Sequence, residues 1–234
     1  MHEQGWQSWS PSTRHGLAEQ PHRWVDAPQR IVSYRSENSA GRDVFWGEGL
    51  RGVAGDPARQ VVVRTRAEVF RGVVTITLRP WRADDLPALL AAHRDPALRR
   101  WLATSLTGEA EARQWLEVQA AGWDSATRFS FAVVTDGNAI GHVVVKMGNA
   151  GTAEVGYWTA PQVRGQGIAT RAVETVSGWA FYTHDLTRLD LLHAEGNTAS
   201  CRVAEKCGYV LHDIVPAAPP GYPVSAHRHV RKNS

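Results

Sequence analysis

Cysteine, lysine and long apolar runs are scarce in this 234-residue chain. The two cysteines, Cys201 and Cys207, are six residues apart and form no Cys-x-x-Cys motif, so they match neither a zinc or haem spacing nor a secreted disulfide framework. No apolar run approaches the roughly 18 residues of a membrane-spanning helix. The first residues, MHEQGWQSWS, lack the basic and apolar segments of a signal peptide. We expect a reduced, cytoplasmic protein with no membrane partner.

Lysine is limited to Lys146, Lys206 and Lys232, so arginine supplies most of the positive charge. The net charge is +3 and the pI about 9.1, which is too weakly basic to indicate direct nucleic-acid binding. The apolar fraction of 43% is sufficient for a sizeable core.

The composition changes near residue 72. Residues 1–72 are rich in Trp, Gly, Ser, Pro and Arg, with short strand-like pieces at 30–35 and 61–65. The strings GWQSWSP, PHR, YRSE and GEGL within residues 1–60 resemble the N-terminal β-domain of melibiase-type α-galactosidases. The catalytic barrel of those enzymes has no room in this chain. We therefore expect residues 1–72 to be an irregular Trp-rich extension, most simply a remnant of an unrelated enzyme. The alternatives are an accessory module, a coil that packs on the main domain, or the result of a start assigned too early.

Residues 73–232 have regular periodicity instead. Alternation predicts strands, four-residue repeats predict helices, and DGN (136–138) predicts a hairpin turn. Thr107 is the predicted N-cap of the second helix. The resulting order, β-α-α-β-β-β-α-β-α-β-β, indicates a mixed sheet with flanking helices. The predicted strands cover 73–81, 128–135, 139–147, 153–159, 188–194, 209–215 and 226–231, and the predicted helices 82–95, 107–123, 167–184 and 197–209.

The segment RGQGIA (164–169) lies between a strand and a helix. Unpaired N–H groups and the dipole at a helix start attract anions, and glycines let an oxygen approach the backbone. Because no Gly-Lys-Ser/Thr follows and the Gly-x-Gly-x-x-Gly spacing is absent, this is neither a Walker loop nor a dinucleotide fingerprint. The segment predicts a pyrophosphate site.

The same segment resembles the pyrophosphate signature of the GCN5-related N-acetyltransferases. Together with LRPW, EVGYWTAP and NTASCRVAEKCGY it resembles the branch that contains the RimJ/RimL ribosomal-protein acetyltransferases, over residues 73–232. The resemblance implies an α/β (α+β) fold with a mixed, mostly antiparallel sheet and splayed central strands. It also implies acetyl-CoA as co-substrate.

By this resemblance the coenzyme-binding residues lie in three places: the strand before the glycine-containing loop, the loop with the first turn of the helix that follows it, and the start of the later helix at Asn197. The backbone of the strand before the loop would pair with the pantetheine arm, the loop and helix start would cradle the pyrophosphate, and Asn197 would contact the pantetheine arm while capping its helix. The strand residues are Tyr157, Trp158 and Thr159, and those of the cradle are Arg164, Gly165, Gln166, Gly167, Ile168, Ala169 and Thr170.

Three residues are candidates for catalysis. Glu154 begins the splayed strand and is the first candidate for the base that deprotonates the amine, with a strand-end ion pair as the alternative. His193 is the second candidate, or else a packed histidine. Ser200 matches a hydroxyl near the departing thiolate, and because Ala204 stands where many members have a tyrosine, the acid is Ser200, water or nothing.

His227 and His229 share one face of the last strand and would line the surface or a cleft, or bind metal; we expect no metal site. The two cysteines are expected to be packing residues. The predicted function is acetyl transfer to an amine, either a protein N-terminus or a small molecule, by a monomer or homodimer. A non-catalytic acyl-CoA-binding or carbohydrate-associated module is the alternative.

Overall fold

The computed structural model describes residues 31–37, 43–49, 63–69, 72–102, 104–219 and 223–233, with side chains from residue 75 onward. The string GWQSWSP therefore lies outside the described residues. Among the described residues, none of the helices combines the length and the apolar character needed to cross a bilayer.

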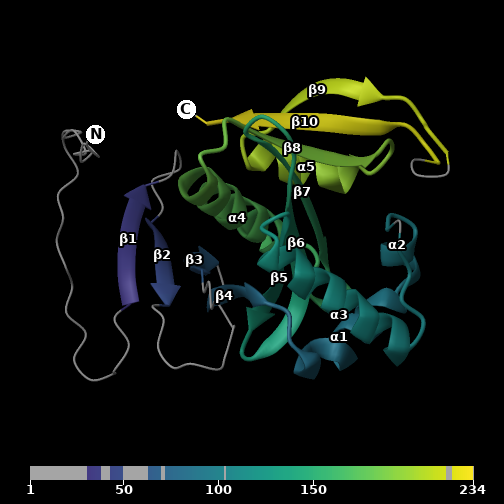
Figure 1. Cartoon of the computed structure of the whole chain (residues 1–234), viewed down its shortest axis with the longest axis horizontal. Coiled ribbons are helices and arrows are strands. Elements are labelled where there is room, and N and C mark those ends of the chain that lie inside the picture. The colour runs from purple at the N-terminus through teal and green to yellow at the C-terminus, as the bar shows by residue number, and fades with distance from the viewer. Residues whose placement is uncertain are drawn as a thin grey trace, which may run out of the picture. The chain divides into compact units, whose positions relative to one another are not determined.

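One ten-stranded sheet organises this part of the chain, in the order β1-β2-β3-β4-β5-β6-β7-β8-β10-β9 (Figure 1). Neighbouring strands are antiparallel except β7 and β8, which are parallel. The sheet is thus mixed and mostly antiparallel, as the sequence predicts. The strands are β1 (Ile31–Glu37), β2 (Asp43–Gly49), β3 (Val63–Val69), β4 (Gly72–Pro80), β5 (Arg128–Thr135), β6 (Asn138–Met147), β7 (Thr152–Thr159), β8 (Arg188–Ala194), β9 (Val210–Val215) and β10 (Ala226–Lys232).

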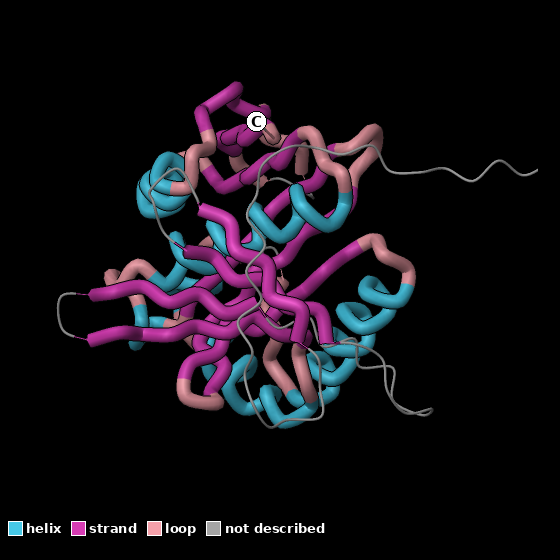
Figure 2. Tube along the Cα trace, turned by 90° about the vertical axis from the view of Figure 1, so that its left-hand side faces the viewer, coloured by secondary structure: helices cyan, strands magenta, loops and turns pink. Residues whose placement is uncertain are grey.

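Helices lie on both sides of the strands (Figure 2). On what we call the α4 face, α4 and α5 pack over a core that includes Phe131, Val155 and Leu191. On the other side, the α1 face, α1 and α3 pack over a second core that includes Leu89 and Trp158. The helices are η1 (Ala83–Asp85), α1 (Leu86–His93), α2 (Pro96–Arg99), α3 (Glu109–Asp124), η2 (Pro161–Val163), α4 (Ile168–His184) and α5 (Thr198–Lys206).

Local chemistry accounts for several boundaries. The β5–β6 hairpin turns at Asp136 and Gly137, both with positive φ, the backbone that a two-residue hairpin turn requires. The predicted helix 82–95 consists of η1 and α1 and ends at His93. Asp95 has an extended backbone and caps α2 by accepting the N–H groups of Ala97 and Leu98. Pro96, which has no N–H to satisfy, occupies the first position of α2.

The predicted N-cap at Thr107 is wrong by one residue, because Gly108 occupies that position. Thr107 instead donates its backbone N–H and its hydroxyl to the Glu111 carboxylate, at 2.7 and 2.9 Å. The backbone N–H of Thr107 therefore has an acceptor, although the N-cap residue of α3, Gly108, has no side chain to cap the helix.

The strands before residue 72 belong to the same sheet. Of the residues predicted as strand-like at 30–35 and 61–65, residues 31–35 lie in β1 and residues 63–65 in β3, while the others lie outside the described residues. Strand β3 pairs with β4 from Val63–Leu78 to Val69–Gly72. This part of the extension is therefore strand rather than irregular backbone. Strand β4 is thus hydrogen-bonded on both edges, to β5 on one and to β3 on the other.

Candidate functional site

The centre of the sheet contains a fork. Strands β7 and β8 pair only from Thr152–Arg188 to Val155–Leu191, although β7 continues to Thr159 and β8 to Ala194. The other edge of β7 stays paired with β6 throughout 153–159. Beyond Val155 the β8-facing edge of β7 therefore offers backbone groups to an extended ligand.

The glycine-containing loop follows the open end of this fork. Gly165 and Gly167 both have φ of +75°, a conformation that favours glycine, and Gly167 is the N-cap of α4. A Cβ on Gly165 would meet no atom within 4 Å, and one on Gly167 only Arg171 Nη2 at 4.0 Å, so the loop surface is open. The first helical bond of α4 runs from Arg171 N–H to Gly167 O, which leaves the preceding amides as potential anion donors.

Two arginines shape this loop. Arg171 donates to the Gln166 carbonyl at 2.9 Å, which folds its side chain back over the loop. Arg164 pairs with Asp95 and lies 3.4 Å from the Thr159 carbonyl. The Arg164 guanidinium holds the pKa of Asp95 below its usual value. The positive charge predicted for the cradle is thus present, but Asp95 already contacts it.

The start of α5 lies across the fork from β7. The Asn197 side chain caps α5 by accepting the Ser200 N–H at 3.3 Å, which agrees with its predicted capping role. The Tyr157 hydroxyl donates to Ser200 Oγ at 3.0 Å, so one hydrogen bond joins β7 to α5. Burial raises the pKa of Tyr157 to about 12, so its hydroxyl stays protonated. The sequence assigned only a backbone role to Tyr157.

Glu154 projects from β7 toward the α1 face, as alternation with Val155 requires. Its carboxylate accepts from Lys146 Nζ at 2.6 Å, and the two side chains are 33% and 39% exposed. Glu154 precedes the open end of the fork by two residues, about 7 Å along the strand. Glu154 therefore lies beside the paired part of β7 and not at the open end of the fork.

Comparison with known proteins accounts for this arrangement. A profile described as the acetyltransferase (GNAT) domain matches residues 75–210, more than half of the chain. The chain belongs to the GNAT acetyltransferase family. YdaF of Bacillus subtilis, named as a ribosomal N-acetyltransferase, is 38% identical over 58 residues, which cover 25% of this chain and 32% of YdaF.

Two solved GNAT structures have the same fold. RimL, the ribosomal L7/L12 alpha-N-protein acetyltransferase in complex with coenzyme A, aligns with a TM-score of 0.62 at 19% identity, over 67% of this chain and 93% of RimL. The microcin C7 self-immunity acetyltransferase MccE, in complex with acetyl-CoA and AMP, aligns with a TM-score of 0.62 at 17% identity, over 68% of this chain and 92% of MccE.

On the α1 face, this GNAT domain carries an aromatic cluster that the sequence did not predict. Trp81, Trp115 and Trp158 surround His142, which lies opposite Trp158 in the β6–β7 ladder. Trp81 Nε1 donates to His142 Nδ1 at 3.0 Å. Burial lowers the pKa of His142 to about 3, so the ring is neutral at physiological pH. The three tryptophans are far apart in the sequence, so the sequence alone does not indicate that they form one cluster around a histidine.

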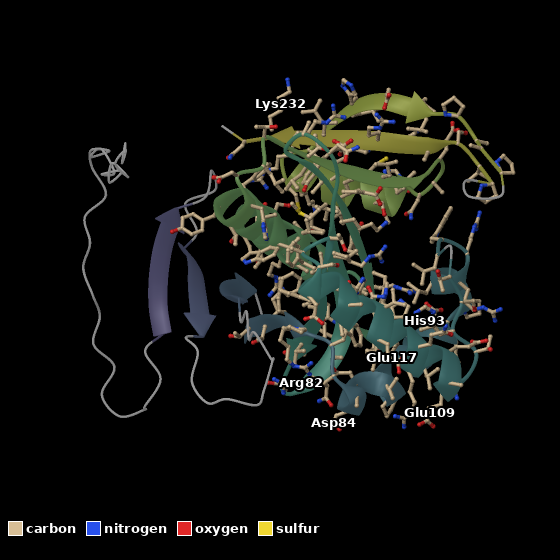
Figure 3. The ribbon with its side chains drawn as sticks, viewed as in Figure 1. Arg82, Asp84, His93, Glu109, Glu117 and Lys232 are labelled. Atoms are coloured by element: carbon tan, nitrogen blue, oxygen red, sulfur yellow. The ribbon has the colours of Figure 1, made fainter. Side chains whose placement is uncertain are left out.

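His93 borders the same cluster from α1. It stacks edge-on to Trp158 with ring centroids 6.0 Å apart, and its Nδ1 accepts the Leu106 N–H at 3.3 Å. Burial lowers the pKa of His93. Figure 3 labels His93 at the lower right, among the helices, and Lys232 at the top, near the end of β10.

On the α4 face, His193 lies beneath α5 and only 9% of it is exposed. Burial lowers its pKa, Nδ1 lies 3.0 Å from the Ala194 carbonyl, and Nε2 lies 3.4 Å from Cys201 Sγ. Cys201 in turn lies 3.4 Å from His227 Nδ1. His193 and Glu154, the two residues predicted as candidate bases, thus lie on opposite faces of the sheet.

Proposed function

We propose that this protein is an acetyl-CoA-dependent N-acetyltransferase. The observation that carries the proposal is the fork between β7 and β8, whose open end leads to the glycine loop and the start of α4. An extended pantetheine arm fits the free edge of β7, and a pyrophosphate fits the amides of the helix start. The structures of RimL in complex with coenzyme A and of MccE in complex with acetyl-CoA support this use of the fold.

The residues around the fork suit direct transfer. Acetyl-CoA supplies an activated acetyl group: the amine nitrogen forms a bond to the carbonyl carbon, the carbon–sulfur bond breaks, and the thiolate gains a proton. A backbone N–H on the free edge of β7 would stabilise negative charge on the carbonyl oxygen. Glu154, through water, would accept the amine proton, and Lys146 holds the carboxylate in place.

Ser200 would face the leaving sulfur, and the hydrogen bond from Tyr157 orients its hydroxyl. The Tyr157 hydroxyl donates its hydrogen to Ser200 Oγ. Tyr157 would therefore position Ser200, and the proton would reach the thiolate from Ser200 or from water.

For the acceptor we propose a protein N-terminal amine, in line with the similarity to YdaF and RimL. The similarity to MccE supports a small-molecule amine as the second acceptor class. The aromatic cluster on the α1 face, which surrounds Trp158 of the fork, would form part of the acceptor surface in either case.

The test follows thiol release from acetyl-CoA by the purified protein with three acceptors: a peptide with a free N-terminus, the same peptide with a blocked N-terminus, and a polyamine. Release with the free peptide alone supports protein N-terminal transfer. Release with the polyamine alone selects a small-molecule acceptor. Coenzyme binding by calorimetry without release for any amine would favour the non-catalytic acyl-CoA-binding module, and absence of binding would overturn the proposal.

A further inference from the structure

Four metal-ligating side chains meet beneath α5, on the α4 face. His193 comes from β8, Cys201 from α5, and His227 and His229 from β10. His227 is directly opposite His193 in the β8–β10 ladder, and His229 lies two residues further along the same face. One ligand atom from each residue lies within 4.8 Å of the other three.

These separations are close to those of a tetrahedral metal centre. Bonds of about 2.0–2.1 Å to nitrogen and about 2.3 Å to sulfur place the ligand atoms of such a centre about 3.3–3.8 Å apart. Cys201 Sγ is already 3.4 Å from His193 Nε2 and 3.4 Å from His227 Nδ1. Small side-chain rotations would bring the remaining atoms into range.

The second observation concerns His229. Its side chain is 1% exposed, and neither ring nitrogen has a hydrogen-bond partner among the described residues. An unsatisfied buried polar group is costly, typically about 1–3 kcal/mol. His229 stacks on His193 with ring centroids 5.2 Å apart, so its nitrogens belong to the cluster and a bound cation would satisfy one of them.

We propose that His193, Cys201, His227 and His229 bind one divalent transition-metal ion, with Zn²⁺ the ion that best suits three imidazoles and a thiolate. Binding would form four metal–ligand bonds and release the Cys201 thiol proton to solvent, with no change in oxidation state. The ion would fasten α5, which carries Asn197 and Ser200, to β8 and β10. It would also occupy Nε2 of His193 and so remove this residue from the base role.

The principal experiment uses the full-length, tag-free and coenzyme-free chain. After treatment with a chelator, the protein is titrated with Co²⁺ and its absorption is recorded. We expect one Co²⁺ per chain, intense tetrahedral d–d bands, a thiolate-to-cobalt charge-transfer band, and displacement of both features by stoichiometric Zn²⁺. Weak octahedral absorption alone, or binding without a charge-transfer band, would overturn the proposal.

Matched variants separate this site from other histidines and cysteines. Cys201→Ser should lose the charge-transfer band and weaken Co²⁺ binding at least about tenfold, since even outer-shell partners contribute roughly 10–100-fold. His227→Gln should weaken binding similarly. Cys207→Ser, which changes the buried cysteine bonded to the Thr170 carbonyl, and His212→Gln, on β9, should bind like wild type. Equal affinity in all four variants would refute the assignment.

A measurement on the unaltered chain does not depend on whether the variants fold. Zn²⁺ should slow alkylation of Cys201, detected by peptide mass spectrometry, with the Cys207 peptide as the internal reference. Zn²⁺ should also raise the melting temperature, because a ligand that binds only the folded state stabilises it. Unchanged Cys201 alkylation at saturating Zn²⁺ would overturn the proposal.

Discussion

The two faces of the sheet bury histidine in opposite ways. On the α1 face, His142 is enclosed by tryptophans and accepts a hydrogen bond from Trp81 Nε1. On the α4 face, His229 is as deeply buried, but its ring nitrogens have no partner among the described residues and lie beside two further imidazoles and a thiol. Hydrogen-bond satisfaction, rather than burial, therefore distinguishes an imidazole that belongs to a core from one that is available to a ligand.

The residues proposed to act on the acceptor and those proposed to act on the coenzyme also lie on different faces of the sheet. Glu154 and the aromatic cluster project toward the α1 face, whereas the Tyr157–Ser200 hydrogen bond and α4 belong to the other. Substitutions on the α1 face should alter acceptor chemistry, and those on the α4 face should alter coenzyme handling.

The largest effect is expected from Glu154→Gln. Loss of a general base lowers kcat by roughly 10²–10⁴, while coenzyme affinity should stay within about twofold because the carboxylate projects to the α1 face. Steady-state kinetics and calorimetry measure the two quantities. Lys146→Gln is the control: it removes the same partly exposed ion pair but keeps the carboxylate, so its effect should be small. A drop in kcat of less than about fivefold for Glu154→Gln would exclude Glu154 as the base.

Gly167→Glu should disable the coenzyme loop. The new carboxylate would occupy the position of a phosphate and repel it, at a cost of about 2–3 kcal/mol, or about 30–150-fold in Kd. Gly137→Glu adds the same charge and side chain at another positive-φ glycine, in the β5–β6 turn, and should leave the Kd unchanged. Equal coenzyme affinity in the two folded variants, measured by calorimetry, would remove the loop from the site.

A third test compares the two buried histidines directly, in metal-free protein. His142→Leu leaves the Trp81 N–H without its acceptor and should cost about 1–3 kcal/mol in the free energy of unfolding. His229→Leu removes an unsatisfied group and should be neutral or stabilising. Urea denaturation measures both. Equal losses in the two variants would contradict the distinction between satisfied and unsatisfied imidazoles.

The buried His142 also makes stability depend on pH. His142 has a folded pKa of about 3 and an unfolded value of about 6.5, so between these values the unfolded state binds more protons. Stability contributed by the neutral ring is present above about pH 6.5 and is lost as the pH falls toward 3. In His142→Leu this part of the pH dependence should disappear.

Tyr157→Phe should have a smaller effect. It deletes the hydroxyl that orients Ser200, a hydrogen bond worth about 1 kcal/mol, so kcat should fall about three- to tenfold. Tyr209→Phe is the matched control, because it removes the hydrogen bond between Tyr209 and Ser177, 2.7 Å long, which belongs to the buried core. The control should lower the melting temperature but not kcat. A fall in kcat of a hundredfold or more for Tyr157→Phe would make its hydroxyl the acid.

The smallest effect on turnover is expected from a chain that begins at Gly72. The fork, the loop and α5 all lie after residue 72, so kcat and coenzyme affinity should stay within about twofold. Its melting temperature should fall, because β4 loses the ladder with β3. A chain that begins at Val61 retains that ladder and should recover the stability. Loss of coenzyme affinity in the shorter chain would make residues 1–72 an integral part of the domain.

Much of the fold follows from local patterns in the sequence. Strands β5 and β8 have the predicted bounds, and Asn197 caps α5 as its position before Thr198 indicates. The family is confirmed, whereas the individual coenzyme and catalytic roles stay predictions. The sequence could place only His227 and His229 on one face. The complete aromatic and His/Cys clusters could not be predicted, because their members come from segments up to 77 and 36 residues apart (Trp81 to Trp158, and His193 to His229) and meet only when the helices pack on the sheet.

The ion pair between Arg164 and Asp95 ties the proposed coenzyme loop to a second helix. Asp95 caps α2, while Arg164 begins the glycine-containing loop. A phosphate bound at this loop would compete with Asp95 for the same guanidinium and would weaken the contact that holds α2. Coenzyme binding and the position of α2 would then share a coupling free energy that is equal in both directions.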